Sequence, residues 1–362
     1  MGRSRKQRRR RAMGLASAAL ALALVVLRGI APSAVAEEVR AEDDVVASLL
    51  AVGDTGGRHA LPWLREGQRS VARGMAAEDR RSPVDALLLL GDLFYPRGIE
   101  RGELVDRVRE NVVLPYCRFA DLSGPRSHEV AGACAASEER RHPVPIFAVP
   151  GDHDYKSPES PVLERRGIPE FLPNWRMHDG VATTAELGGG LSLVLVDTPA
   201  ATHGQDFAAV REALRRARGP WRIVAAHLPV APGDAKADLE WRSDAPPLEH
   251  FSLPEAPVHL YLAGHRHNLQ VIEGRSPGPR LHVIAGSGAT IRPVRFRYEG
   301  RRFALEQTGF ARVDLVGRGG NQRLVVSLFS MPRFPIFFWA EPQLVSRWSV
   351  DRSGGVRREA LE

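Results

Sequence analysis

The sequence is poor in cysteine, with only Cys117 and Cys134 among its 362 residues. A C-x₂-C pair is absent, which argues against the thiolate-rich zinc sites built on that spacing. The two cysteines lie in a stretch rich in Gly, Ser and Arg, YCRFADLSGPRSHEVAGAC, so we expect a surface insertion over about residues 116–142. In an exported protein such a pair can form a disulfide, and two free structural thiols are an equal alternative.

Acidic residues are missing from the first 36 positions, which carry eight basic ones. The formal net charge of +7 is therefore local, because it falls to about −1 once these eight are set aside. This charge balance gives no support for a nucleic-acid-binding surface on the rest of the protein.

The same segment has the layout of an export signal. The basic stretch RSRKQRRRRA precedes the apolar run MGLASAALALALVVL, which is shorter than the roughly 20 residues that a membrane span needs. Ala34 and Ala36 form a small-x-small pattern, so we expect a signal peptide over residues 1–36 with cleavage after Ala36. No cysteine follows the run, which argues against a lipoprotein. We expect a periplasmic or extracellular protein without a stable membrane span; an uncleaved N-terminal anchor is the alternative, and Arg28 opposes it.

Internal repeats and further long apolar runs are absent, and short apolar runs alternate with helical patterns instead. Near-continuous apolar runs predict strands covered on both faces, at 46–52, 86–90, 145–149, 191–196, 222–226, 258–263 and 281–285. Helical patterns occur at about 61–79, 102–113 and 206–217. Residues 311–317 and 323–330 indicate further strands, in an antiparallel pair. This alternation favours an α/β fold.

Five of the predicted strands are followed within a few residues by aspartate or histidine, and in four of them a glycine stands first, which lets the backbone turn sharply. The residues concerned are Asp54, Asp92, Asp152, His227, and the pair His265 and His267. Loops at the carboxyl ends of strands in open α/β sheets converge, and carboxylate oxygens with imidazole nitrogens are ligands for divalent and trivalent metals. The pattern therefore predicts a site for two metal ions.

Other residues of the same types carry no such signal. Gly233-Asp234 lies away from any strand end, where Gly and Asp are common turn residues. Apart from His153, which is discussed below, the remaining eight histidines, among them His259 and His282 inside predicted strands, are interpreted as structural.

The strings GDTGG, GDLFY, GDHD, AHLPV and AGHRHN together resemble the calcineurin-like metallophosphoesterases, and most of all their small purple acid phosphatases of the tartrate-resistant type. General members carry D-x-H in the first motif, whereas Thr55 and Gly56 follow Asp54 here. The purple branch has a tyrosine in G-D-x-x-Y, and Tyr95 stands at that position. The resemblance covers about residues 46–289. It implies a four-layer α/β sandwich of two mixed β-sheets flanked by helices.

The resemblance also implies roles for individual residues. The ligands of the first metal, ferric iron in this family, would be Asp54, Asp92, Tyr95 and His267, with Asp92 as the bridge. The ligands of the second metal, Fe, Zn or Mn, would be Asp152, His227 and His265. His153 would face the substrate, where it binds the phosphate or protonates the leaving oxygen, and Asp154 would orient His153. The implied reaction is attack of a metal-bound hydroxide on phosphorus.

Two positions depart from the family pattern. Residue 152 is Asp where the family has Asn, and the extra negative charge should tighten cation binding, weaken the pull on an anionic substrate and raise the pKa of bound water. We expect an active enzyme with an altered metal choice or pH optimum; a degenerate, non-catalytic site is the alternative. Arg266 stands between the two histidines of GHRH, where it either projects into solvent or reaches the substrate phosphate.

These observations predict an exported dinuclear-metal phosphoesterase that hydrolyses phosphomonoesters of small molecules or peptides. The metallophosphoesterase domain would cover residues 37–330, followed by a C-terminal extension over 331–362 whose role the sequence does not indicate. Phosphodiesterase or pyrophosphatase activity on the same site, and a metal-stabilised binding domain without catalysis, are the alternatives. We expect a monomer.

Overall fold

The computed structural model describes residues 44–56, 66–135, 140–204, 206–230, 246–274, 278–294, 300–332 and 340–361. The expected signal peptide at 1–36 and the Gly233-Asp234 turn lie outside these ranges. Within them, none of the helices combines the length and the apolar character that a membrane crossing requires.

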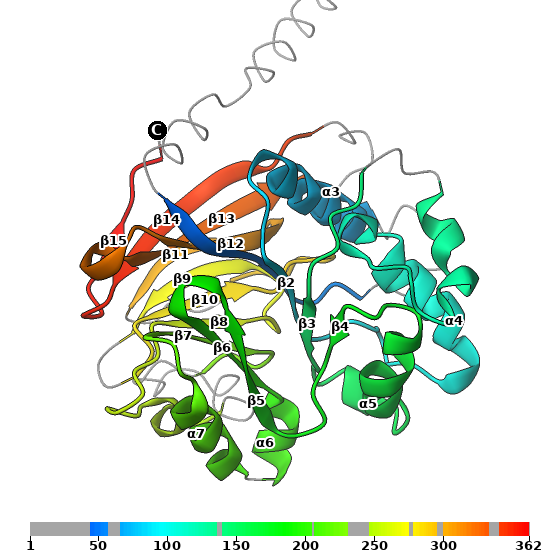
Figure 1. Cartoon of the computed structure of the whole chain (residues 1–362), viewed down its shortest axis with the longest axis horizontal. Coiled ribbons are helices and arrows are strands. Elements are labelled where there is room, and N and C mark those ends of the chain that lie inside the picture. The colour runs from blue at the N-terminus through cyan, green and yellow to red at the C-terminus, as the bar shows by residue number, and fades with distance from the viewer. Residues whose placement is uncertain are drawn as a thin grey trace, which may run out of the picture. The chain divides into compact units, whose positions relative to one another are not determined.

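Two mixed β-sheets form the centre of the fold (Figure 1). The strands of the first sheet are β1 (Val45–Val52), β2 (Ala86–Leu90), β3 (Ile146–Val149), β4 (Trp175–Arg176), β12 (Thr308–Val316), β13 (Arg323–Met331), β14 (Gln343–Asp351) and β15 (Val356–Arg358). They are arranged in the order β15-β14-β13-β12-β1-β2-β3-β4. Strands β1 to β4 are parallel and the remaining pairs are antiparallel.

The second sheet is built in the same way. Its strands are β5 (Ala182–Leu187), β6 (Leu191–Val196), β7 (Trp221–Ala226), β8 (Leu260–Ala263), β9 (Leu269–Glu273), β10 (Leu281–Ala285) and β11 (Arg301–Leu305), in the order β11-β9-β10-β8-β7-β6-β5. Strands β6, β7, β8 and β10 are parallel. Each sheet therefore presents a set of parallel strand ends at one edge.

Helices cover the outer faces of the two sheets (Figure 1). Their bounds are α3 (Glu66–Arg81), α4 (Leu104–Val108), α5 (Ser160–Val162), α6 (Thr198–Gly204) and α7 (Phe207–Arg216). The predicted helix at 102–113 is divided, because a π-helical segment, Arg109–Val113, follows α4. The predicted helix at 206–217 is confirmed as α7, whose first turn is capped by the Asp206 carboxylate.

Three apolar clusters explain why the strands are almost continuously apolar. Neighbouring residues of one strand point to opposite faces, so Leu49 joins the core between the sheets and Leu50 joins the core under α3. In the second sheet, Ile223 lies in the core between the sheets and Val224 in the core under α7. The predicted α/β sandwich of two helix-flanked sheets is thereby confirmed.

The C-terminal region extends the first sheet. The predicted antiparallel pair at 311–317 and 323–330 is confirmed as β12 and β13. Strands β14 and β15 then add to the same sheet, from a segment for which the sequence indicated no structure.

The cysteine-containing segment is both bonded and partly buried. Cys117 and Cys134 form a disulfide. Between them, Phe119 and Val130 are buried in the core under α3, so this segment packs into the fold as well as facing solvent.

A buried arginine joins the end of α3 to the first sheet. Arg312 on β12 is completely buried, and its Nε donates to Asp314 Oδ1 at 2.8 Å. Its two terminal nitrogens donate to the carbonyl and the hydroxyl of Ser82, at 2.7 and 2.9 Å. Arg312 therefore satisfies polar groups that the packing of the helix on the sheet removes from water.

Replacing Arg312 with Met leaves the Asp314 carboxylate buried without its guanidinium partner. We expect the free energy of unfolding, measured in urea, to fall by about 3–5 kcal/mol. The double variant Arg312→Met/Asp314→Leu removes both charges and should recover most of that loss. Equal losses in the single and double variants would contradict this account of the pair.

Candidate metal centre

The seven predicted metal ligands come together at the carboxyl ends of strands from both sheets. Asp54, Asp92 and Asp152 follow β1, β2 and β3 of the first sheet, with Tyr95 three residues after Asp92. The histidines His227, His265 and His267 follow β7 and β8 of the second sheet. Donor atoms of Asp152, His227 and His265 lie within 4.8 Å of one another, as do those of Asp54, Asp92 and His227. With Tyr95 and His267 beside Asp54 and Asp92, the ligands form two adjoining groups: a first with Asp54, Asp92, Tyr95 and His267, and a second with Asp152, His227 and His265.

The backbone of four of these residues is in the left-handed region. Asp54, Asp92, His265 and His267 have φ values of 56°, 54°, 69° and 45°. In the part of the chain that the structure describes, these are all the non-glycine residues with positive φ. This conformation costs about 1–3 kcal/mol per residue and persists where the surrounding structure imposes it, most often at functional sites. No pattern in the sequence predicts this backbone conformation.

The glycines before the ligands allow close approach of the backbone. A Cβ on Gly53 would lie 2.9 Å from Gly264 Cα, and a Cβ on Gly264 would lie 2.9 Å from Asp54 Oδ2. Gly53 follows β1 and Gly264 follows β8, so the two sheets meet backbone to backbone beside the ligands. We expected these glycines to supply a sharp turn; at Gly53 and Gly264 their missing side chain matters more than their φ.

The first ligand group is centred on the Tyr95 hydroxyl. Tyr95 Oη lies 2.5 Å from Asp92 Oδ2, 2.9 Å from Asp54 Oδ1 and 3.0 Å from His267 Nε2. The other ring nitrogen of His267, Nδ1, bonds Thr290 Oγ1 at 2.6 Å, which fixes the ring. A hydroxyl has one hydrogen, so it cannot donate to the Asp54 and Asp92 oxygens at once. The donor set fits a cation of high charge.

The second ligand group contains facing lone pairs. His227 Nδ1 lies 2.8 Å from the Leu90 carbonyl, which only accepts, so Nδ1 carries a hydrogen. In the neutral ring the lone pair is then on Nε2, which is 3.2 Å from Asp152 Oδ1 and 3.5 Å from Asp92 Oδ1. His265 Nδ1 is also 3.2 Å from Asp152 Oδ1. A cation between these atoms would turn repulsion into coordination, so this group also fits a metal ion.

The pKa values show the same excess of negative charge. Burial alone would lower the pKa of His227, but the carboxylates of Asp92 and Asp152 raise it to about 10. Burial and the neighbouring carboxylates hold the pKa of Tyr95 far above its usual range. Burial likewise raises the pKa of Asp54, and Asp92 adds to the rise. Negative charge that the protein does not balance favours the binding of cations.

Asp154 has partners other than the one we expected. Its fully buried carboxylate accepts hydrogen bonds from the amides of Gly151 at 2.8 Å, Leu93 at 3.1 Å and Phe94 at 3.2 Å. These bonds go to backbone amides of two loops and none of them to the His153 ring, so orientation of His153 by Asp154 stays a prediction. Asp154 joins the loop after β3 to the loop after β2, which carries Asp92 and Tyr95.

His153 is held from other directions. Its amide donates to Asp92 Oδ1 at 2.9 Å, and its ring lies against that of Tyr95, with centroids 4.4 Å apart. Its Nδ1 bonds the Pro96 carbonyl at 2.8 Å, and its Nε2 is 2.9 Å from Lys156 Nζ. The motifs in the sequence assign no role to Lys156. Its position three residues after His153 is the feature that could have indicated one.

Two further charged residues, Arg266 and Asp197, lie near the ligand groups. Arg266 is half-buried between the two histidine ligands, and its role toward a substrate stays a prediction. Asp197 follows β6 at the same edge and could have been found from that position. Its Oδ2 instead accepts from Tyr155 Oη at 2.5 Å and from Arg165 at 2.6 Å, which gives it a structural role beside the ligand groups.

The two strand histidines lie inside the fold, away from the ligand groups, and a structural role for them stays a prediction. His259 and His282 are almost fully buried, and His259 Nδ1 accepts from the Arg222 amide at 3.2 Å. Burial lowers the pKa of both imidazoles to about 4, so they are neutral near pH 7.

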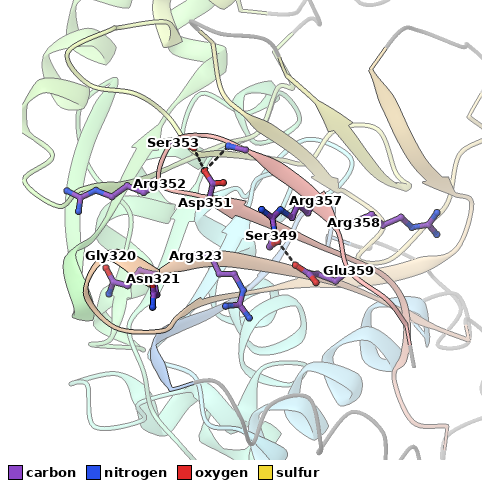
Figure 2. Close-up of a pocket in the computed structure, with 12 residues that line it drawn as sticks. Gly320, Asn321, Arg323, Ser349, Asp351, Arg352, Ser353, Arg357, Arg358 and Glu359 are labelled. Atoms are coloured by element: carbon purple, nitrogen blue, oxygen red, sulfur yellow. Dashed lines mark hydrogen bonds between the residues drawn. The ribbon is translucent and has the colours of Figure 1, made fainter.

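A separate cavity of about 750 Å³ lies beside the ends of β13, β14 and β15. Figure 2 shows its polar lining, which includes Asp351, Arg357 and Glu359. None of the predicted metal ligands lines it. The metal centre and this cavity are therefore different places on the protein.

The close contact of Gly91 with His227 can be tested by substitution. Gly91 has a φ of 82°, and a Cβ there would lie 2.7 Å from His227 Nδ1, the atom that bonds Leu90. We expect Gly91→Ala to displace this ring and to weaken metal affinity by about 10–100-fold, as loss of an orienting contact does. Metal analysis after gel filtration and calorimetric titration measure the loss.

Gly102→Ala is the matched control, because a Cβ there has no heavy atom within 4 Å. It should keep the wild-type metal content. Wild-type metal affinity in Gly91→Ala would show that the contact with His227 does not hold the ligand in place.

Comparison with known proteins identifies the family. The family model for calcineurin-like phosphoesterases matches residues 47–269, which include all seven predicted ligands. A comparison with curated protein sequences found no match.

Three solved structures share the fold. GAP50, the anchor in the inner membrane complex of Plasmodium, is 16% identical with a TM-score of 0.56, over 79% of this chain and 85% of that chain. Purple acid phosphatase PPD1 from yellow lupin (Lupinus luteus) seeds is 13% identical with a TM-score of 0.54, over 84% of this chain and 54% of the lupin chain. PhoD is 10% identical with a TM-score of 0.51, over 88% and 72%.

The family match and the two ligand groups agree with each other. The matched region covers more than half of the chain. Members of this family typically use two metal ions, and this protein has two groups of side chains that could hold them. The chain belongs to the calcineurin-like phosphoesterase family and is a metal-dependent phosphoester hydrolase.

Proposed function

We propose that the protein is an exported phosphomonoesterase of the purple acid phosphatase type. The observation that carries the proposal is the position of Tyr95 Oη, in contact with Asp54, Asp92 and His267. The resemblance of G-D-x-x-Y to the purple branch supports a tyrosinate ligand at this position. The Cys117–Cys134 disulfide supports export, because disulfides persist in oxidising compartments.

The two ligand groups divide the metal ions between them. Asp54, Tyr95 and His267 would hold the first ion, and Asp152, His227 and His265 the second. Asp92 is suited to bridge, because its Oδ2 contacts Tyr95 at 2.5 Å while its Oδ1 faces His227 at 3.5 Å. We propose iron at the first position and Fe, Zn or Mn at the second. Bound ions of this kind supply Lewis-acid chemistry, which activates water and neutralises phosphate charge.

His153 is the residue we assign to the substrate side. Its ring is 21% exposed, and its Nδ1 is occupied by the Pro96 carbonyl, so Nε2 is the atom that would meet a substrate, in exchange for its 2.9 Å contact with Lys156 Nζ. From this position it would bind the phosphate or protonate the leaving oxygen. Asp154 acts through the backbone, by fixing the loops that carry Asp92 and His153.

The activity is tested with para-nitrophenyl phosphate and the corresponding bis ester, with and without a chelator. We expect the metal-loaded protein to hydrolyse the monoester with a kcat/KM at least about tenfold higher, a difference of about 1.4 kcal/mol in transition-state stabilisation. The chelator should abolish turnover. Preference for the diester or for pyrophosphate would refute the monoester assignment. Turnover of no ester by protein with two bound metals would favour a binding role without catalysis.

Tyr95 ligation is tested by spectroscopy. A phenolate bound to ferric iron gives a visible charge-transfer band, so oxidised, iron-loaded protein should be coloured. We expect Tyr95→Phe to lose this band while it keeps bound iron. Tyr155→Phe is the matched control, because its hydroxyl bonds Asp197 instead, and it should keep the band. A band that survives in Tyr95→Phe would rule out Tyr95 as the ligand.

A further inference from the structure

Lys156 lies beside the metal centre, in a protein that otherwise uses arginine almost throughout. It is one of only three lysines among the 50 lysines and arginines of the sequence. Its Nζ lies 2.9 Å from His153 Nε2 and 3.7 Å from Asp152 Oδ2. Its side chain is 45% exposed, so the ammonium is accessible from solvent on the side of His153.

The other hydrogen bond of His153 shows which partner donates in its contact with Lys156. Because His153 Nδ1 donates to the Pro96 carbonyl, the lone pair of the neutral ring is on Nε2. An ammonium can only donate, so Lys156 donates to Nε2. The positive charge on the substrate side of the second ligand group is then that of Lys156.

Lys156 also balances the unusual residue in the GDHD motif. The family that this sequence resembles has a neutral Asn where Asp152 stands, so the second ligand group carries one extra negative charge. Lys156 adds one positive charge four residues later, within 3.7 Å of that carboxylate. The local charge is thereby restored.

A lysine suits this position better than an arginine. Its compact ammonium has three N–H donors that rotate about one bond, whereas a guanidinium presents a rigid planar fork. One donor serves His153 and one faces Asp152, which leaves the third for a further acceptor. The acceptor that a phosphoesterase brings to this place is a phosphate oxygen.

We infer that Lys156 is a phosphate-binding residue, which offsets the charge of Asp152 and donates to the phosphate group of the substrate. The inference rests on the proposed function and deepens it. A phosphomonoester carries up to two negative charges at its phosphate and a diester carries one, so a cation here favours the monoester.

The test measures binding of inorganic phosphate to the protein at saturating metal, by calorimetry. We expect Lys156→Gln to weaken phosphate binding about tenfold, the effect of one lost charge-assisted hydrogen bond. Its metal content should equal or exceed that of the wild type, since Asp152 keeps its full charge. Arg166→Gln is the matched control, because it removes an exposed cation that pairs with Asp179 at 3.6 Å. It should bind phosphate like the wild type.

A double variant separates charge balance from a simple loss of contact. In Asp152→Asn/Lys156→Gln both charges are gone, so phosphate affinity should lie closer to the wild type than in Lys156→Gln alone. An affinity in the double variant no better than in Lys156→Gln would overturn the balancing role.

Because phosphate binding needs no turnover, this test is independent of the monoester assay. If Lys156→Gln weakens phosphate binding while the wild type hydrolyses no monoester, the role of Lys156 stands and the proposed function fails. If the monoester is hydrolysed and Lys156→Gln binds phosphate as tightly as the wild type, the inference about Lys156 is wrong. In an active enzyme, we expect the KM for the monoester to rise more than the KM for the diester.

Discussion

Hydrogen-bond acceptors that face one another are the constraint on which this structure depends. At the meeting point of the two sheets, the Tyr95 hydroxyl has one hydrogen for two carboxylate oxygens, those of Asp54 and Asp92. When its ring is neutral, as a metal ligand must be, the His227 lone pair points toward two carboxylates within 3.5 Å. Such an arrangement is unfavourable for the protein alone, so the rest of the fold has to impose it. Part of the energetic cost is backbone strain, because Asp54 and Asp92 are held in the left-handed region.

The two sheets impose the arrangement jointly. The first sheet supplies the carboxylates and the second supplies the imidazoles, so neither sheet holds a complete ligand set. Their relative position is fixed by the shared apolar core and by the contact of Gly53 with Gly264 directly beside the ligands. A change in how the sheets pack would therefore alter the distance between carboxylates and imidazoles, which couples the core to the chemistry of the site.

The elements that could be predicted from sequence are those whose local residue pattern matches the burial of the element in the fold. Strands covered on both faces, such as β2 and β3, are apolar at every position, whereas β5 (ATTAEL) is half-buried and has no such run. The ligands were predictable because each follows such a strand. The partners of Asp154 were not, because the amides of Leu93 and Phe94 come from a loop about 60 positions away. Positive φ at Asp54 also arises only from tertiary packing.

The departure from the family pattern at residue 152 shows why a single position is a poor guide to a charged site. Asp152 alone indicates a site with less attraction for an anionic phosphate. Within the same loop, Lys156 lies close enough to Asp152 to oppose that charge, and its ammonium also contacts His153 Nε2. Coulomb interactions act over several ångströms, so a bound substrate responds to the summed charge of the whole loop and not to the charge of one residue. The sequence GDHDYK is therefore better understood as one charge-balanced unit than as a motif with an altered residue.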